Sequence, residues 1–116
     1  MKMEEIRSEK DVVDCLPGYS DFEKAVYVET YRIPYGKVST YQRVAKAVGN
    51  PKACRAVANT LHNNPLYPVV PCWRVVKSDG GFGGEGKAAA GRRQRVREEG
   101  VPIRDGKVII TDEILF

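Results

Sequence analysis

Apolar residues between positions 20 and 33 recur at the intervals of one helix face. Ser20 and Glu23 have the spacing of a capping box, in which the two residues satisfy each other's free backbone N–H groups. The apolar positions of the predicted helix are Phe22, Ala25, Val26 and Ile33. Pro34-Tyr35-Gly36 stops the pattern, so the sequence predicts one helix between Ser20 and Pro34.

Two further helices are predicted between residues 39 and 63. Ser39 and Gln42 repeat the capping-box spacing and open a short helix. Asn50 suits the cap of the next helix, and Pro51 suits its first position because the missing N–H would be unpaired there. That helix is expected to run to about Asn63. Two short helices joined by a tight turn indicate a helix-turn-helix. The second helix of the pair is expected to carry Lys52, Arg55, Asn59 and His62.

The second half of the chain predicts extended, looped and helical segments in turn. Residues 66–76 are largely apolar but contain Pro68 and Pro71, which favours buried extended chain over a central strand. Residues 80–86 contain five glycines and form a loop in this prediction. A helix follows over 87–98, and Asp105-Gly106 between β-formers predicts a hairpin.

These elements predict a mainly α fold, a small winged helix-turn-helix-like domain with short β elements. We assign residues 20–116 to this domain and residues 1–19 to an N-terminal extension. A chain of 116 residues, 42% of them hydrophobic, has room for one domain with a modest core. No apolar run approaches the roughly 18 residues of a membrane span, so no membrane association is expected.

The cysteines and the charged N-terminus bear on the cellular setting. No apolar segment follows the charged first residues, so no secretory signal is expected. Cys15, Cys54 and Cys72 are odd in number and include no Cys-x-x-Cys pair. This pattern argues against a disulfide framework or a zinc site and favours a reducing, cytoplasmic setting. We expect no bound metal.

The net charge of +4 suits a polyanionic partner. Residues 87–97 contain five basic residues and no acidic ones. A helix face exposed to solvent explains this run as well as nucleic-acid binding does.

Three side chains are candidates for chemistry or binding. Cys72 lies in an apolar segment, where most cysteines are inert core residues. Arg55 on a recognition helix would usually contact phosphate, and Tyr41 would usually be half-buried packing. Their combination matches a known arrangement.

The sequence resembles the DNA-binding, active-site domain of the alkylguanine-DNA alkyltransferases (methylated-DNA–protein-cysteine methyltransferases) and their alkyltransferase-like relatives. The resemblance extends from about Phe22 to Gly100. It rests on ordered segments at residues 33–41, 50–57, 63–65, 70–76 and 99–100.

The resemblance implies a protein that flips O6-alkylguanine out of duplex DNA and needs no cofactor. Arg55 matches the arginine that takes the place of the flipped nucleotide, where a planar cation fills the unstacked gap. Tyr41 matches the tyrosine that rotates the nucleotide and hydrogen-bonds the base. Lys52 and Asn59 are further expected DNA contacts. The residues expected around the base are Asn64, Val70, Pro71, Cys72, Trp73 and Arg74, with part of the Gly-rich loop.

In the family, a cysteine thiolate takes the alkyl group irreversibly. Cys72 matches this cysteine, and Glu99 matches the glutamate that orients a histidine directly after it. Here that position is Trp73, whose indole N–H is only a donor and cannot take the thiol proton. Loss of a general base typically slows a reaction by about 10²–10⁴-fold. Without the histidine, Glu99 would pair with an arginine or with water.

Three functions therefore remain open. The first is single-turnover transfer to Cys72. The second is non-enzymatic recognition of O6-alkylguanine, which signals to other repair proteins. The third is binding of undamaged DNA by a plain winged helix, which the combination of Tyr41, Arg55 and Pro71-Cys72 makes least favoured. A monomer is expected.

Overall fold

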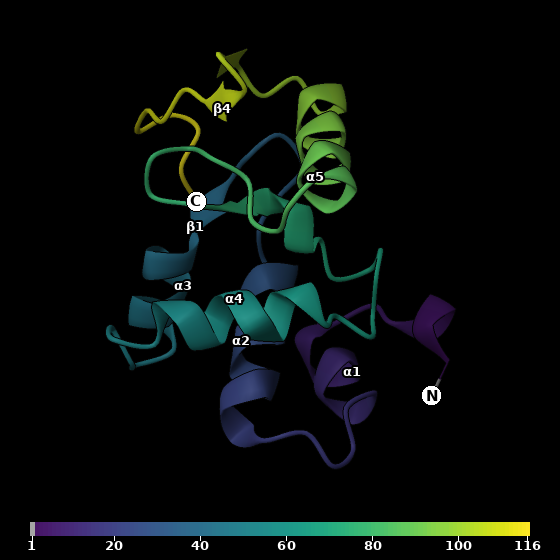
Figure 1. The fold of residues 1–116 in the computed structure, drawn as a ribbon. Coiled ribbons are helices and arrows are strands. Elements are labelled where there is room, and N and C mark those ends of the chain that lie inside the picture. Colours follow the sequence, from purple (N-terminus) through teal and green to yellow (C-terminus); the bar gives the residue numbers. More distant parts are fainter. Residues whose placement is uncertain (1) are drawn as a thin grey trace.

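The computed structural model describes residues 2–116 as a mainly helical fold with very short strands (Figure 1). The α-helices are α1 Glu9–Asp14, α2 Asp21–Tyr31, α3 Tyr41–Ala47, α4 Cys54–His62 and α5 Lys87–Glu98. The 3-10 helices are η1 Met3–Glu5 and η2 Cys72–Arg74. The strands are β1 Ser39–Thr40, β2 Val75–Val76, β3 Ile103–Arg104 and β4 Lys107–Val108. The predicted fold class is confirmed.

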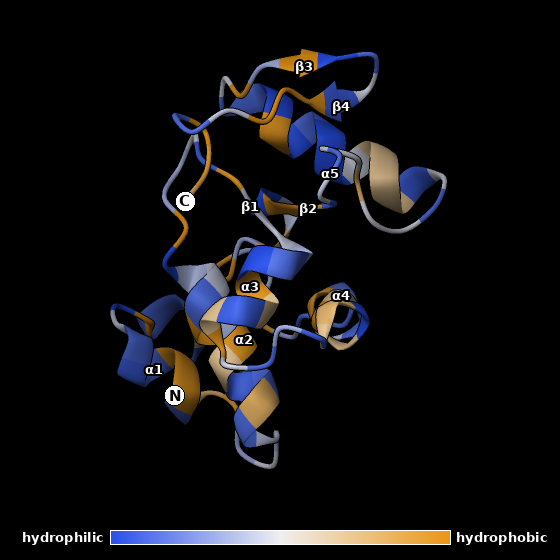
Figure 2. Ribbon diagram, turned by 90° about the vertical axis from the view of Figure 1, so that its left-hand side faces the viewer, coloured by the Kyte–Doolittle hydropathy of each residue, from blue (hydrophilic) through white to orange (hydrophobic). Residues whose placement is uncertain are grey.

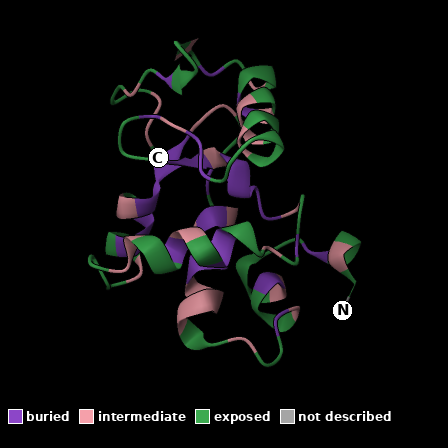
Figure 3. Cartoon of the chain, in the orientation of Figure 1, coloured by how far each residue is buried: buried purple, intermediate pink, exposed green. Residues whose placement is uncertain are grey.

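The helices divide between two ends of the molecule. Figure 1 shows α1 to α4 gathered at one end and α5 at the other with strand β4, which pairs with β3. Buried residues concentrate within the first group and around β1, whereas α5 is mostly exposed and polar (Figures 2 and 3). None of the helices within residues 2–116 combines the length and apolarity that a bilayer crossing requires.

The predicted capping box at the start of α2 is confirmed. Ser20 Oγ accepts a hydrogen bond from the Glu23 N–H at 3.1 Å, and the Glu23 carboxylate accepts from the Ser20 N–H at 3.0 Å. Farther along α2, the buried Tyr27 hydroxyl donates to the Thr60 carbonyl oxygen at 2.7 Å. Burial raises the pKa of Tyr27 to about 12. This hydrogen bond joins α2 to α4 inside the core.

The residues before α2 share its core. Val12 on α1 and Leu16 directly after α1 have no exposed surface, and α1 packs against α2. Ser8 caps α1 by accepting a hydrogen bond from the Asp11 N–H at 3.2 Å. The N-terminal segment therefore buries apolar surface that α2 would otherwise leave open.

The predicted start of α3 is wrong by one residue. Ser39 belongs to β1, because it pairs with Val75 from a distant part of the chain. Thr40 caps the helix instead, accepting a hydrogen bond from the Arg43 N–H at 3.1 Å. Gln42 completes no capping box, since its side chain donates to the Pro51 carbonyl oxygen at 2.7 Å.

The predicted start of α4 is also wrong. Asn50 and Pro51 lie in a turn, where the Asn50 carbonyl oxygen accepts a hydrogen bond from the backbone N–H three residues on. The helix begins only at Cys54, and no side chain caps it. Lys52 therefore precedes the helix, and Arg55 is its second residue. Helices α3 and α4 pack together as the two helices of a helix-turn-helix.

The sequence predicted an extended chain over residues 66–76, but the structure shows that only part of this segment is extended. Residues 72–74 form η2, because the Pro71 carbonyl oxygen accepts a hydrogen bond from the Arg74 N–H at 3.0 Å. Only Val75 and Val76 form a strand, β2, which pairs in parallel with β1. The pairing joins the chain that leads into α3 to the chain that leaves η2.

The Gly-rich loop packs against the C-terminal hairpin. The predicted hairpin turn is confirmed, with Asp105 and Gly106 at φ values of 53° and 78°. Gly80 lies so close to β4 that an added Cβ would be 2.2 Å from the Val108 carbonyl oxygen. The Val108 N–H donates to the Gly80 carbonyl oxygen at 2.9 Å, so this contact requires glycine.

Val12→Ala should destabilise the protein by about 2 kcal/mol, because it removes two methyl groups from a fully buried position. Val13→Ala is the matched control. The Val13 side chain is 37% exposed, so its substitution should destabilise the protein by well under half as much as Val12→Ala. Urea denaturation measures both. Equal effects would mean that α1 does not belong to the cooperative folding unit.

Candidate functional site

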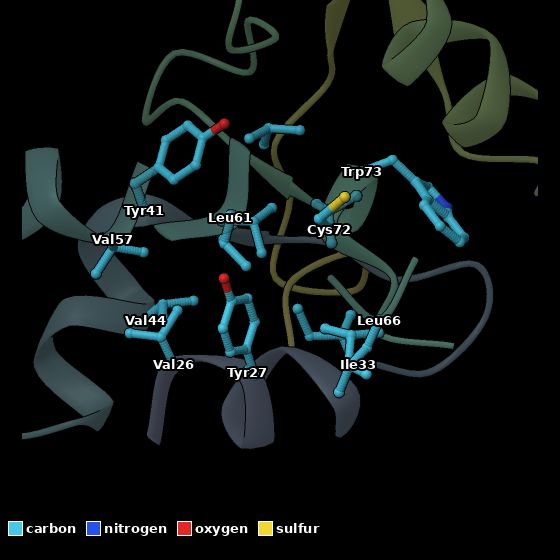
Figure 4. Packing of buried hydrophobic residues seen from close by; sticks show 14 of the residues in the cluster. Val26, Tyr27, Ile33, Tyr41, Val44, Val57, Leu61, Leu66, Cys72 and Trp73 are labelled. Atoms are coloured by element: carbon cyan, nitrogen blue, oxygen red, sulfur yellow. The ribbon is translucent and has the colours of Figure 1, made fainter. Parts of the chain in front are cut away.

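Cys72 and Trp73 leave η2 in different directions. In Figure 4 the Cys72 sulfur lies among buried side chains that include Leu61, whereas the Trp73 indole points away from them. Cys72 is 8% exposed and is a free thiol. The two side chains therefore point in different directions from η2, although they are adjacent in the chain.

A cavity of about 470 Å³ opens beside these two residues. The end of α4, the following turn, η2 and one face of α5 form its wall. The side chains that line it are Leu61, His62, Asn64, Tyr67, Cys72, Trp73, Lys87, Ala88, Gly91, Arg92, Gln94 and Arg95. A mostly apolar cavity of this size with a few polar groups is typical of a small-ligand site.

The Trp73 indole makes the contact that a histidine at this position would be expected to make. Its Nε1–H donates to Glu99 Oε2 at 2.8 Å. The expected pairing of Glu99 with an arginine is also present, because Arg74 Nε donates to both carboxylate oxygens at 3.0 and 3.1 Å. The indole nitrogen of Trp73 has no free lone pair, and the Arg74 guanidinium is already protonated. Neither Trp73 nor Arg74 can therefore accept a proton from Cys72.

The Glu99 carboxylate is buried but remains charged. Its side chain is 6% exposed, and its Oε1 also accepts the Gly36 N–H at 2.9 Å. Burial would raise the pKa of Glu99, but the hydrogen bonds from Arg74, Gly36 and Trp73 outweigh it and lower that pKa below its ordinary value. A buried ion is tolerable here because several donors satisfy it.

Arg74 lies outside the cavity wall. Its side chain is 15% exposed, donates to the Ile33 carbonyl oxygen at 2.7 Å and lies 5.7 Å from the ring centroid of Tyr35. Arg74 and Glu99 thus join the turn after α2 to η2 and to the end of α5.

A second depression lies along the helix-turn-helix. This groove, of about 720 Å³, is lined by Tyr41, Lys52, Cys54, Arg55, Ala58, His62, Lys77, Gly83 and Gly84. Arg55 is exposed, whereas Tyr41 is 5% exposed. Asn59 is exposed on α4 but does not line the groove.

His62 lines both the cavity and the groove. Its Nε2 lies 3.2 Å from the Tyr41 hydroxyl oxygen. Burial and then the charge of Arg92 lower the pKa of His62, so the ring is neutral at pH 7 and can accept this hydrogen bond. Burial raises the pKa of Tyr41. Gly83 covers the pair so closely that an added Cβ would be 2.2 Å from the tyrosine oxygen.

Asn64 shapes the turn between the groove and η2. Its side-chain nitrogen donates to the Val70 carbonyl oxygen at 2.8 Å, and its side-chain oxygen accepts the Leu66 N–H at 2.9 Å. Val70 and Pro71 are buried behind this turn and do not line the cavity. Of the residues expected around a base, the structure gathers Asn64, Cys72 and Trp73 in the wall.

Residues 21–101 match the family model described as the DNA-binding domain of 6-O-methylguanine DNA methyltransferase. The chain belongs to this methyltransferase family. A probable methylated-DNA–protein-cysteine methyltransferase of Acanthamoeba polyphaga mimivirus is 48% identical over 63 residues, 53% of this chain and 42% of that protein. The enzyme of Methanosarcina acetivorans is 43% identical over 68 residues, 59% of this chain and 44% of that protein. The chain spans less than half the length of these relatives.

Solved structures include both branches of the methyltransferase family. The structure of S. pombe Atl1 with damaged DNA containing O6-carboxymethylguanine matches with a TM-score of 0.73 and 32% identity, covering 83% of this chain and 94% of that one. Mycobacterium tuberculosis O6-methylguanine methyltransferase matches with a TM-score of 0.65 and 33% identity, covering 70% and 49% of the two chains.

The contribution of α5 to the cavity was not predicted from the sequence. Lys87, Arg92 and Arg95 were recognised only as part of a basic run, but the structure places them in the wall of the same cavity as Cys72. The small residues Ala88 and Gly91 share their helix face, and this pattern of small and basic residues could have indicated a packed or ligand-facing side. Within residues 2–116, no three His, Cys, Asp or Glu side chains gather as a metal site would require.

Glu99→Gln should lower the free energy of unfolding by about 3 kcal/mol at pH 7, because it leaves the poorly exposed Arg74 charge uncompensated. The folded-state pKa of Glu99 is depressed, so the stabilisation is present above the ordinary value of 4.5 and is lost as pH falls through the folded-state pKa. The difference between the variant and the unmodified protein should therefore shrink in acid.

Denaturation at several pH values measures this difference. Glu98→Gln is the control, since Glu98 is exposed and its loss should cost less than about 0.5 kcal/mol. If Glu99→Gln is as stable as the unmodified protein at pH 7, the carboxylate does not hold η2 in place.

Proposed function

We propose that this protein flips O6-alkylguanine out of duplex DNA and takes the alkyl group onto Cys72. The observation that carries the proposal is the position of the Cys72 thiol, on the wall of a base-sized cavity that meets the helix-turn-helix groove at His62. A nucleotide that leaves a duplex in the groove would have the cavity directly beside it.

The groove has the side chains that duplex binding requires. Lys52 and Lys77 supply positive charge for phosphates. The exposed Arg55 guanidinium is planar and can fill the gap that a flipped base leaves in the stack. Tyr41 lies at the inner side of the groove, where its hydroxyl could meet the flipped base.

The transfer is a displacement at the alkyl carbon. A lone pair of the Cys72 thiolate forms the sulfur–carbon bond, the carbon–O6 bond breaks, and the guanine that leaves takes up a proton. Trp73 cannot accept the thiol proton and Glu99 is held by Arg74, so we assign the proton to water. Cysteine thiols in general are ionised by a few per cent near neutral pH, so the reaction is slowed but not prevented.

A second candidate function is recognition of the lesion without transfer. The hydrogen bond between Trp73 and Glu99 favours it, because this contact replaces the proton relay that the family's histidine would provide. The similarity to S. pombe Atl1 in complex with damaged DNA agrees with it. A protein of this kind would bind the lesion and leave its removal to other repair proteins.

Incubation with duplex DNA containing one O6-methylguanine separates these functions. Transfer predicts a mass gain of one methyl group that maps to Cys72 and is absent in Cys72→Ala. An unmodified protein that still prefers the damaged duplex supports recognition alone. No preference for the damaged duplex contradicts both functions.

Trp73→His should accelerate transfer by about 10²-fold, because it restores a proton acceptor next to Cys72 within reach of Glu99. Single-turnover rates with the methylated duplex measure the effect. Trp73→Phe is the control, since it keeps an aromatic ring but adds no base. Equal rates for the two variants would show that the missing base does not limit transfer.

A further inference from the structure

One face of α5 places three cations in the cavity wall beside Cys72. Lys87, Arg92 and Arg95 all line it, and the wall formed by residues 2–116 contains no aspartate or glutamate. Glu85, in the loop before α5, is exposed and outside the wall. The other α5 residues in the wall are Ala88, Gly91 and Gln94, which are uncharged, so within residues 2–116 no carboxylate of the wall competes with a ligand for the cations.

These cations have no acidic partner within residues 2–116. Arg92 Nη1 donates to the Gly83 carbonyl oxygen at 3.1 Å, and Arg95 Nη1 donates to the Tyr67 hydroxyl at 3.0 Å. A guanidinium carries five N–H donors, so each arginine keeps most of its donors for a ligand.

The position of Arg95 is fixed by aromatic rings. Its guanidinium carbon lies 3.9 Å from the centroid of a Trp73 ring and 5.3 Å from that of Tyr67. The two rings meet edge to face, with centroids 5.6 Å apart. A cation held in this way loses little freedom when it binds an anion. The Arg92 charge also contributes to lowering the pKa of His62 across the cavity.

We infer that the cavity selects O6 substituents that carry a negative charge, such as a carboxymethyl group. A carboxylate one bond beyond the alkyl carbon can accept paired N–H donors from an arginine. The inference rests on the proposed function, because it names the class of alkylated guanine that the same cavity takes. Attraction of these cations to DNA phosphates would instead strengthen binding to every duplex alike.

The test compares duplexes that differ only in one substituent. Cys72→Ala, which cannot accept an alkyl group, is titrated with duplexes containing O6-carboxymethylguanine, its neutral isostere O6-carbamoylmethylguanine, or unmodified guanine. We expect the carboxymethyl duplex to bind about 10-fold more tightly than the carbamoylmethyl duplex, as for a charge-assisted hydrogen bond. The preference should weaken as salt is raised.

Variants of α5 test whether the cavity wall causes the preference for the carboxymethyl duplex. Arg92→Gln and Lys87→Gln, each in the Cys72→Ala background, should bring the ratio between the two substituted duplexes toward one. Arg97→Gln is the matched control, since Arg97 is exposed on the same helix outside the wall and should weaken both complexes equally.

Equal binding of the carboxymethyl and carbamoylmethyl duplexes overturns the inference. If both still bind better than unmodified DNA, the proposed function stands without it. If neither does, the proposed function fails as well, and the two failures are thereby distinguished. A preference that survives Arg92→Gln, Lys87→Gln and Arg95→Gln together also overturns the inference, because the charge would then be recognised outside this wall.

Discussion

The buried charge of Glu99 holds together the parts of the molecule that form the cavity. Its carboxylate accepts hydrogen bonds from Trp73 and Arg74 in η2 and from the backbone of Gly36 in the turn after α2. Both segments are far from Glu99 in the chain. Removing an ion from water is costly, and these donors together offset the cost. The arrangement therefore tolerates little displacement, and the orientation of η2, which sets where Cys72 points, follows from it.

Two surfaces of different character meet at His62. The groove along the helix-turn-helix is basic and open, as binding along a phosphate backbone requires, whereas the cavity beside Cys72 is mostly apolar with cations on one wall. The hydrogen-bonded pair of Tyr41 and His62 lies at their junction, under the backbone of Gly83. Under the proposed function, binding to the duplex and recognition of one base therefore fall to different side chains, which meet at His62.

Local patterns were predictable from the sequence, and contacts between distant segments were not. The capping box at Ser20 and the Asp105-Gly106 turn depend on neighbouring residues alone, and both were confirmed. The starts of α3 and α4 were misplaced because strand pairing drew Ser39 away and the Asn50 backbone closed a turn. The partner of Trp73 and the cations of the cavity could not be inferred, since they depend on how α5 packs against η2.

The separation of the groove from the cavity has a consequence for how the protein folds. Helices α1 to α4 pack mainly on one another, through contacts between successive or nearby elements. The cavity instead needs α5 to pack back on η2 across residues 75–86, the segment that contains the Gly-rich loop. We therefore expect helices α1 to α4 to assemble first, and the contact of α5 with η2 to open first under stress. Under the proposed function, a partly opened molecule would still hold a duplex while Cys72 had lost the surroundings that define a substrate.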